Sequence, residues 1–153
     1  MAASDEIRPG QGVGPHALGD TEQDIRLRLG EPLSEERDVE VWLDYEALRF
    51  QIWPSAEECV AITVIAADGG ALPNGVRVGS TLADLRAAYP RLQYDWELMG
   101  WLSPETIGVS FYLIHYDGGG ISRAFLEDDE VPEDSVTVKW ISVLSDVDNE
   151  WPD

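Results

Sequence analysis

Apolar and polar residues alternate between positions 39 and 53, which is the period of a β-strand. One face of this stretch carries Val39, Val41, Leu43, Tyr45, Leu48, Phe50 and Ile52, and the other carries Glu40, Trp42, Asp44, Arg49, Gln51 and Trp53. The pattern predicts a hairpin that turns near residues 46–47. Apolar or alternating runs predict further strands at 59–66, 92–102, 106–116, 121–127 and 136–144.

A short phrase occurs twice, as LGDTEQDIRLRLG at 18–30 and as VGSTLADLRAAYP at 78–90. Each copy predicts a helix of about two turns that begins after a threonine, Thr21 or Thr81. The threonine oxygen can accept a backbone N–H, and an aspartate three residues later makes the pattern close to a capping box, although Glu or Gln is the usual residue there. Gly30 is suited to end the first helix, because glycine adopts positive φ readily. Helices this short depend on tertiary packing.

These elements predict an α+β fold within a single domain, residues 1–153. It would consist of two tandem units, at about 14–70 and 75–147, each a short helix packed on an antiparallel sheet of three or four strands. The turn-rich segment 68–75 would connect the units. An acidic tail follows at 146–153.

The charge is extreme: 30 Asp and Glu stand against 10 Lys and Arg, for a formal net charge of −20 over 153 residues. Such a chain repels nucleic acid and anionic membranes, because binding to either requires Lys and Arg. It attracts basic proteins and accelerates their encounter. Solubility or a salt-rich habitat is an alternative explanation of the same charge.

Localisation is inferred from what the sequence lacks. No signal peptide is visible in MAASDEIRPG, and no apolar run approaches the length of a membrane-spanning helix. Cys59 is the only cysteine and lies in an apolar run, so we expect a buried, inert thiol. The expectation is a cytoplasmic protein.

Candidate catalytic and metal-binding motifs are weak. His16 and His115 lack partners at metal-ligand spacing, and the acidic run 127–134 does not match a calcium-binding EF-hand loop. GQGVG at 10–14 follows no strand and opens no long helix, which argues against a phosphate site. No nucleophile elbow or Cys–His pair is present. We therefore expect a protein that is not an enzyme and that holds no cofactor or metal.

The repeated phrase follows a pattern of Gly, Asp or Ser, Thr, and then an apolar pair, and its first copy ends in Gly-x-Pro. In this it resembles the small outer-membrane lipoprotein A family and β-lactamase inhibitory protein-like domains, over about thirty residues plus the strand pattern behind them. The resemblance implies tandem helix-and-sheet units whose exposed sheet surface binds another protein. The chain departs from these relatives in lacking a secretion signal, a lipid-attachment cysteine and disulfides. A small acidic binder of this plan is similar to the immunity proteins of bacterial toxin systems, which neutralise a cognate toxin domain.

The leading hypothesis is therefore an inhibitor of a cognate, basic bacterial toxin domain. The predicted partner-binding residues are Glu40, Trp42, Asp44, Trp53, Asp95, Glu97, Tyr112, Asp128, Asp129 and Glu130. Tryptophan on a polar strand face is typical of an interface anchor, although packing against the other unit would explain it equally. One alternative is a small-molecule-binding or regulatory module with a pocket between the repeats, lined by Trp96, Trp101 and Trp140. Another is an adaptor or homodimer formed by edge-strand pairing.

Overall fold

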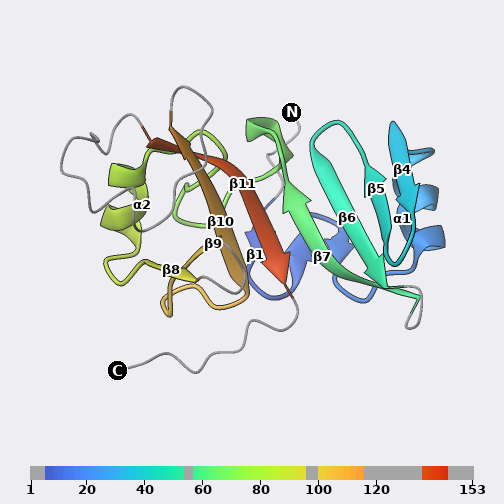
Figure 1. Ribbon diagram of the computed structural model, residues 1–153, viewed down its shortest axis with the longest axis horizontal. Helices are drawn as coiled ribbons and strands as arrows, with labels where there is room; N and C mark the ends of the chain where they lie inside the picture. Colours follow the sequence, from blue (N-terminus) through green and yellow to red (C-terminus); the bar gives the residue numbers. More distant parts are fainter. Residues whose placement is uncertain (1–5, 54–56, 96–99, 116–135, 145–153) are drawn as a thin grey trace.

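The computed structural model describes residues 6–53, 57–95, 100–115 and 136–144 (Figure 1). The strands are β1 (Ile7–Arg8), β2 (Gly12–Val13), β3 (His16–Ala17), β4 (Ser34–Arg37), β5 (Val41–Asp44), β6 (Leu48–Trp53), β7 (Glu58–Val64), β8 (Gln93–Asp95), β9 (Gly100–Leu102), β10 (Val109–His115) and β11 (Val136–Leu144). The helices are α1 (Glu22–Leu29), α2 (Leu82–Ala88) and the 3-10 turn η1 (Ala67–Gly69). None of these helices is long and apolar enough to cross a membrane.

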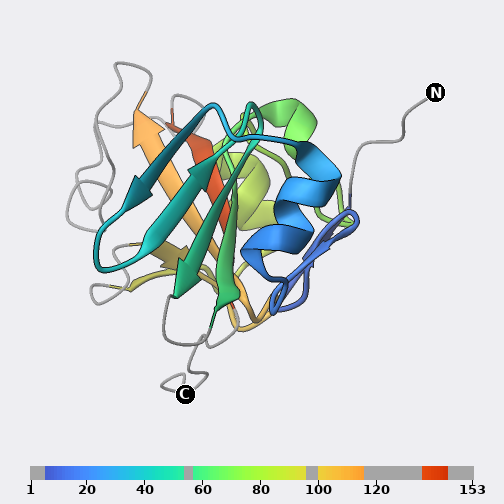
Figure 2. The same ribbon diagram turned by 90° about the vertical axis from the view of Figure 1, so that its right-hand side faces the viewer.

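Eight strands form one antiparallel sheet in the order β4-β5-β6-β7-β11-β10-β9-β8. Strands β4 to β7 follow one another as hairpins, and β11 pairs with β7 from Val64↔Ile141 to Ala61↔Leu144. A second sheet, β1-β2-β3, lies with α1 and α2 on one face of the large sheet (Figure 2). The core is packed between these layers. Its largest fully buried side chains include Phe50, Ile62, Phe111, Leu113 and Ile141.

The predicted α+β fold of two helix-on-sheet units is wrong. The described chain is mostly β, with two short α-helices and one continuous eight-stranded sheet rather than two sheets. The physical reason lies at β7 and β11, because an unpaired strand edge leaves backbone N–H and C=O groups without partners. Pairing β7 with β11 satisfies those groups and joins the apolar faces of both strands into one core.

The repeated phrase has the predicted local structure in both copies. The Asp24 N–H donates to Thr21 Oγ1 at 3.1 Å, and the Thr21 N–H donates back to Asp24 Oδ2 at 3.1 Å. Thr81 and Asp84 make the same pair of bonds at 3.1 and 3.2 Å. The two capping boxes are therefore confirmed. Capping depends on neighbours within one turn, so it could be predicted without knowledge of the tertiary structure.

The hairpin predicted between 39 and 53 is confirmed for β5 and β6, which pair from Val41↔Ile52 to Asp44↔Arg49. The start of the strand was misplaced, because Val39 is 82% exposed in the turn before β5. That turn joins β5 to β4, whose SEER sequence has no apolar residue. An edge strand exposed on both faces carries no hydrophobic period, which is why the pattern missed it.

Other boundaries also differ from the predicted ones. The single strand expected at 92–102 consists of β8 and β9, which pair with each other. The three two-residue strands of the small sheet were not predicted, because strands this short within a Gly- and Pro-rich segment show no periodicity. The pairing expected at 121–127, the acidic loop at 127–134 and the tail at 146–153 lie outside the described residues.

Candidate functional site on the open face of the sheet

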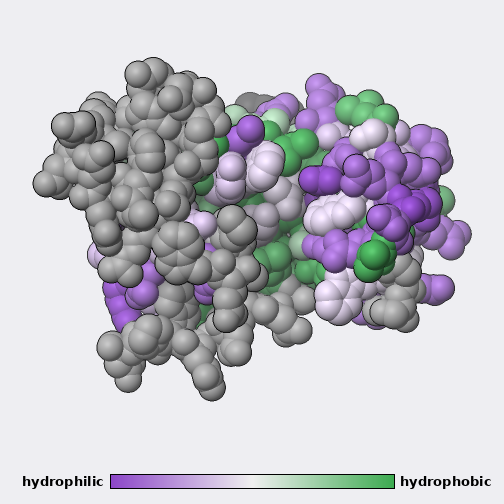
Figure 3. All heavy atoms as spheres, viewed as in Figure 1, coloured by the Kyte–Doolittle hydropathy of each residue, from purple (hydrophilic) through white to green (hydrophobic). Residues whose placement is uncertain are grey.

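One face of the large sheet carries no helix or strand among the described residues, as the view along the sheet shows (Figure 2). We call it the open face. Its side chains come from the strand positions that alternate with the buried ones, so Trp42 on β5 is half-buried beside the buried Val41 and Leu43. In Figure 3 the open face is hydrophilic over β4 to β6 and less polar toward its centre.

A row of polar residues runs across six strands of the open face, set by the pairing register. In strand order the row is Ser34, Asp44, Arg49, Thr63, Ser142 and Ser110. The Ser34 hydroxyl donates to Asp44 at 3.0 Å, and the hydroxyls of Thr63 and Ser142 lie 2.9 Å apart. The hydroxyl pair spans the junction between β7 and β11 and links the two halves of the sheet.

A groove of about 430 Å³ lies on this row where the halves meet. It is lined by Trp42, Asp44, Arg49, Thr63, Ile65, Trp140 and Ser142. The Arg49 guanidinium lies over the Trp42 ring, 4.3 Å from the ring centroid, which is a cation–π arrangement. Its Nε atom is 2.8 Å from Asp44 Oδ1, although this contact lacks hydrogen-bond geometry and is an ion pair only. Arg49 thus holds Trp42 in place from the next strand.

The other side of the groove is also aromatic. Trp140 stacks on Tyr112 of the neighbouring strand, with ring centroids 4.7 Å apart and an interplanar angle of 26°. The Lys139 ammonium lies 5.2 Å from the Trp140 ring centroid. Stacked rings held by strands lose little conformational freedom on binding, so they are suited to contact a partner.

The predicted site residues fall into separate groups. Trp42 and Asp44 line the groove, and Tyr112 supports Trp140 beside it. Glu40 accepts a hydrogen bond from Gln51 at 2.6 Å, and Trp53 is 50% exposed at the end of β6. Asp95 lies on the opposite edge strand, β8. Glu97, Asp128, Asp129 and Glu130 lie outside the described residues.

Five groove residues were not among the predicted site residues: Arg49, Thr63, Ile65, Trp140 and Ser142. Arg49 shares the alternation that identified Trp42, so the same pattern would have found it. Thr63 and Ser142 are polar positions within otherwise apolar strands, which is a usable but weaker signal. The alternative hypothesis places Trp140 in a pocket with Trp96 and Trp101, but Trp101 is 3% exposed and belongs to the core on the other face.

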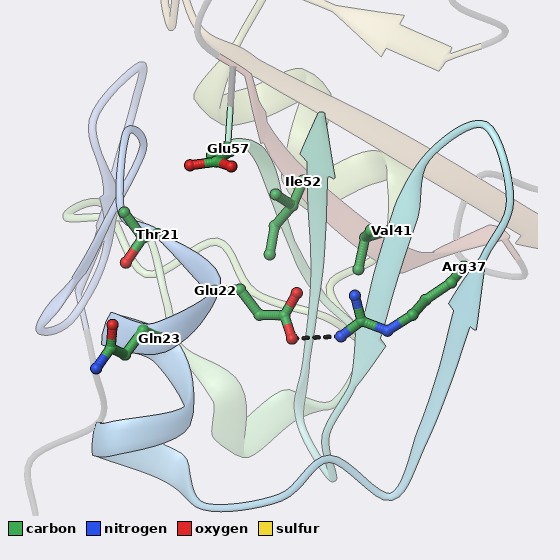
Figure 4. A pocket seen from close by; sticks show the side chains of 7 residues that line it. All are labelled: Thr21, Glu22, Gln23, Arg37, Val41, Ile52 and Glu57. Carbon is green, nitrogen blue, oxygen red and sulfur yellow. Dashed lines mark hydrogen bonds and ion pairs between the residues drawn. The ribbon is translucent and has the colours of Figure 1, made fainter. Parts of the chain in front are cut away.

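A second groove, also about 430 Å³, lies between the first turn of α1 and strands β5 and β6 (Figure 4). Two of its polar side chains pair across it, because Glu22 on α1 accepts a hydrogen bond from Arg37 on β4. Arg26 extends the network to Glu22, Glu31 and Glu35. Since α1 buries only Ile25 completely, this network is a main attachment of the helix to the edge of the sheet.

We expect Glu22→Gln to lower the free energy of unfolding by about 0.5–1 kcal/mol at neutral pH, the range for exposed ion pairs. Hydrogen bonds from Arg37 and Arg26 hold the pKa of Glu22 below its ordinary value of 4.5, although partial burial opposes them. A carboxyl with a lowered folded-state pKa stabilises the fold above its unfolded pKa, and this stabilisation is lost as the pH falls through the folded-state pKa. Urea unfolding between about pH 7 and about pH 3 should therefore show the difference from wild type shrinking.

Glu58→Gln is the matched control, because Glu58 is exposed on β7 and has no ion pair among the described residues. It should leave the unfolding curve nearly unchanged at every pH. Equal destabilisation by both variants would mean that the network around Arg26 and Arg37 does not stabilise the protein.

The side chains of Cys59 and His16, which are candidates for reactive groups by residue type, do not line the groove on the open face. Cys59 is buried, and burial raises the pKa of its thiol to about 12, so it stays protonated as predicted for an inert thiol. His16 is 3% exposed and packs edge-on against Phe50, with ring centroids 5.3 Å apart. No three His, Cys, Asp or Glu side chains of the described part of the chain are grouped to hold a metal ion.

Comparison with known proteins identifies no relative. No family model matches the chain, no curated protein matches it, and no solved structure matches its fold. The function is therefore inferred from the chain's own residues and their arrangement.

Proposed function

We propose that this protein is an inhibitor that binds a basic partner protein through the open face, as immunity proteins bind the toxin domains they neutralise. The observation that carries the proposal is the groove between Trp42 and Trp140, on a sheet face that no described element covers. A sheet face with aromatic side chains at its centre is well suited to lie against another protein.

The groove contains Trp42, Arg49 and Trp140, with Tyr112 stacked on Trp140 beside it, and these residue types often dominate binding energy at protein interfaces. Trp, Tyr and Arg are enriched among such hot spots, which lie near the centre of the contact and lose water on binding. Trp42, Arg49, Trp140 and Tyr112 are half-buried and held by their neighbours, so binding would cost little side-chain entropy. The affinity would thus come from these anchors.

The charge would act mainly on the rate of association. At −20 the field of the whole chain attracts a basic domain from a distance, while Asp44 compensates Arg49 within the groove. Association with such a partner should slow as ionic strength rises, because salt screens exposed charges. Binding of a neutral small molecule in the groove would show little salt dependence.

The test is co-expression with the product of the adjacent reading frame, followed by titration of the purified components. Trp42→Ala is expected to weaken binding at least about thirtyfold, the effect of losing a central aromatic hot spot. Trp53→Ala is the matched control, because Trp53 is an exposed tryptophan of the same hairpin that does not line the groove. It should change the dissociation constant less than about threefold.

Circular dichroism of both variants separates lost binding from lost folding. Absence of a complex, or equal losses of affinity in the two tryptophan variants, would exclude the open-face groove as the binding centre.

A further inference from the structure

A third groove, of about 410 Å³, lies at the other end of α1 from the groove of Figure 4. It runs between the last turn of α1, the start of β4 and the β5–β6 turn, and we call it the α1–turn groove. The Tyr45 hydroxyl donates to the Gly30 carbonyl at 2.8 Å and ties that turn to the end of the helix. The walls of the groove are therefore held together before anything binds.

The apolar part of the α1–turn groove is open to solvent. Leu29 is 38% exposed and Leu33 is 76% exposed, while Leu48 and His16 beneath them are buried. Large apolar side chains that are exposed together at one groove are typical of contact sites. Single exposed leucines, by contrast, are common on protein surfaces. An apolar side chain of a ligand would bury part of both leucines.

The rim of the same groove is negative. Glu46 and Asp68 are exposed, and neither has an ion-pair partner in the part of the chain that the structure describes. Glu31 also lines it and contacts Arg26, but no Lys or Arg is among the lining residues. The open-face groove differs, because Arg49 already occupies it.

We propose that the α1–turn groove binds a segment of a partner protein that carries an apolar side chain next to lysine or arginine. The apolar side chain would lie against Leu29 and Leu33, and the cation would pair with Glu46 and Asp68. A second copy of this chain fits poorly, because its charge of −20 would meet the same negative rim. The surface is separate from the open face and binds whether or not the open face does.

The probe is the tripeptide acetyl-Lys-Leu-Lys-amide, titrated into the isotope-labelled full chain and followed by NMR chemical shifts. The comparison peptide replaces leucine with glycine and keeps the charge. Backbone shifts at residues 29–33, 45–48 and 68 should move with the leucine peptide. The glycine peptide should bind at least about threefold more weakly, because it lacks the apolar contact.

Two double variants separate the groove from general electrostatic attraction. Glu46→Gln with Asp68→Asn should weaken the leucine peptide about three- to tenfold more than Asp38→Asn with Glu58→Gln. The second pair removes the same charge away from the groove, because Asp38 lies in the turn before β5 and Glu58 at the start of β7, paired with Trp53 at the end of β6. Leu33→Gln should weaken the leucine peptide and leave the glycine peptide unchanged.

Equal effects of the two double variants, shifts spread over the whole acidic surface, or no preference for leucine would each overturn the proposal. So would self-association that Leu33→Gln abolishes in sedimentation velocity, because the groove would then be covered by a second copy. None of these results depends on the open face, whose test uses a different ligand and different residues.

Discussion

Gly108→Ala is expected to lower the free energy of unfolding by more than about 3 kcal/mol, because two independent penalties coincide. Gly108 has φ +92°, a conformation that strains any side chain. A Cβ atom there would also overlap the Cα and N atoms of Gly10, which belongs to the turn of the small sheet. The Gly108 carbonyl accepts hydrogen bonds from Leu144 at 2.9 Å and Gly10 at 3.3 Å, so the backbone cannot withdraw without losing them.

Gly75→Ala isolates the first of these penalties. Gly75 has φ +93°, but nothing lies within 4 Å of a Cβ atom at that position. It should cost about 1 kcal/mol, the strain of a non-glycine residue at positive φ. Chemical denaturation of the two variants measures the difference. Similar losses of unfolding free energy in the two variants would show that the small sheet can move away from Gly108 at little cost. The close approach of Gly10 and Gly108 would then contribute little to stability.

Phe50→Ala is expected to cost about 3–5 kcal/mol, the range for removing a large aromatic side chain from a core. Phe50 is fully buried on β6 and meets His16 and Tyr45 edge-on, with centroid distances of 5.3 and 5.7 Å. Those contacts join the large sheet to β3 and to the β5–β6 turn. Truncation would leave a cavity at the point where the layers meet.

Phe50→Leu retains most of the apolar volume and should cost less than half as much. Urea unfolding with intrinsic tryptophan fluorescence measures both variants, and a shifted midpoint with an unchanged denaturant slope would show that stability alone has changed. A loss below about 1 kcal/mol for Phe50→Ala would mean that the layers around β6 collapse into the space.

These variants also bear on binding, because Phe50 and the open face share one strand. Arg49 and Gln51 flank Phe50 in the chain and point to the opposite face, so a loosened β6 would shift Arg49 away from Trp42. Reduced binding in Phe50→Ala would therefore be expected even though Phe50 lies in the core.

Part of the candidate site could be predicted from local pattern alone. The alternation of β5 and β6 placed Trp42, Asp44 and Arg49 together, because a two-residue period and a short turn determine both face and register. Trp140 could not be placed in this way. The pairing of β10 with β11 shifts register at Lys139, so the alternation counted from Val136 is interrupted before Trp140 and the indole reaches the open face.

The sequence by itself determined the elements whose causes lie within a few residues. These are the two capping boxes, the β5–β6 hairpin, the buried thiol at Cys59 and the large negative charge. Only the tertiary structure decided that one eight-stranded sheet replaces two helix-on-sheet units, and that Trp42 and Trp140 face a common groove. Both depend on the pairing of β7 with β11, in which the paired residues are almost eighty positions apart in the sequence. Such pairing depends on which strand edges still have unpaired backbone groups, and which apolar faces are still exposed, when the whole chain collapses. A local sequence pattern does not contain this information.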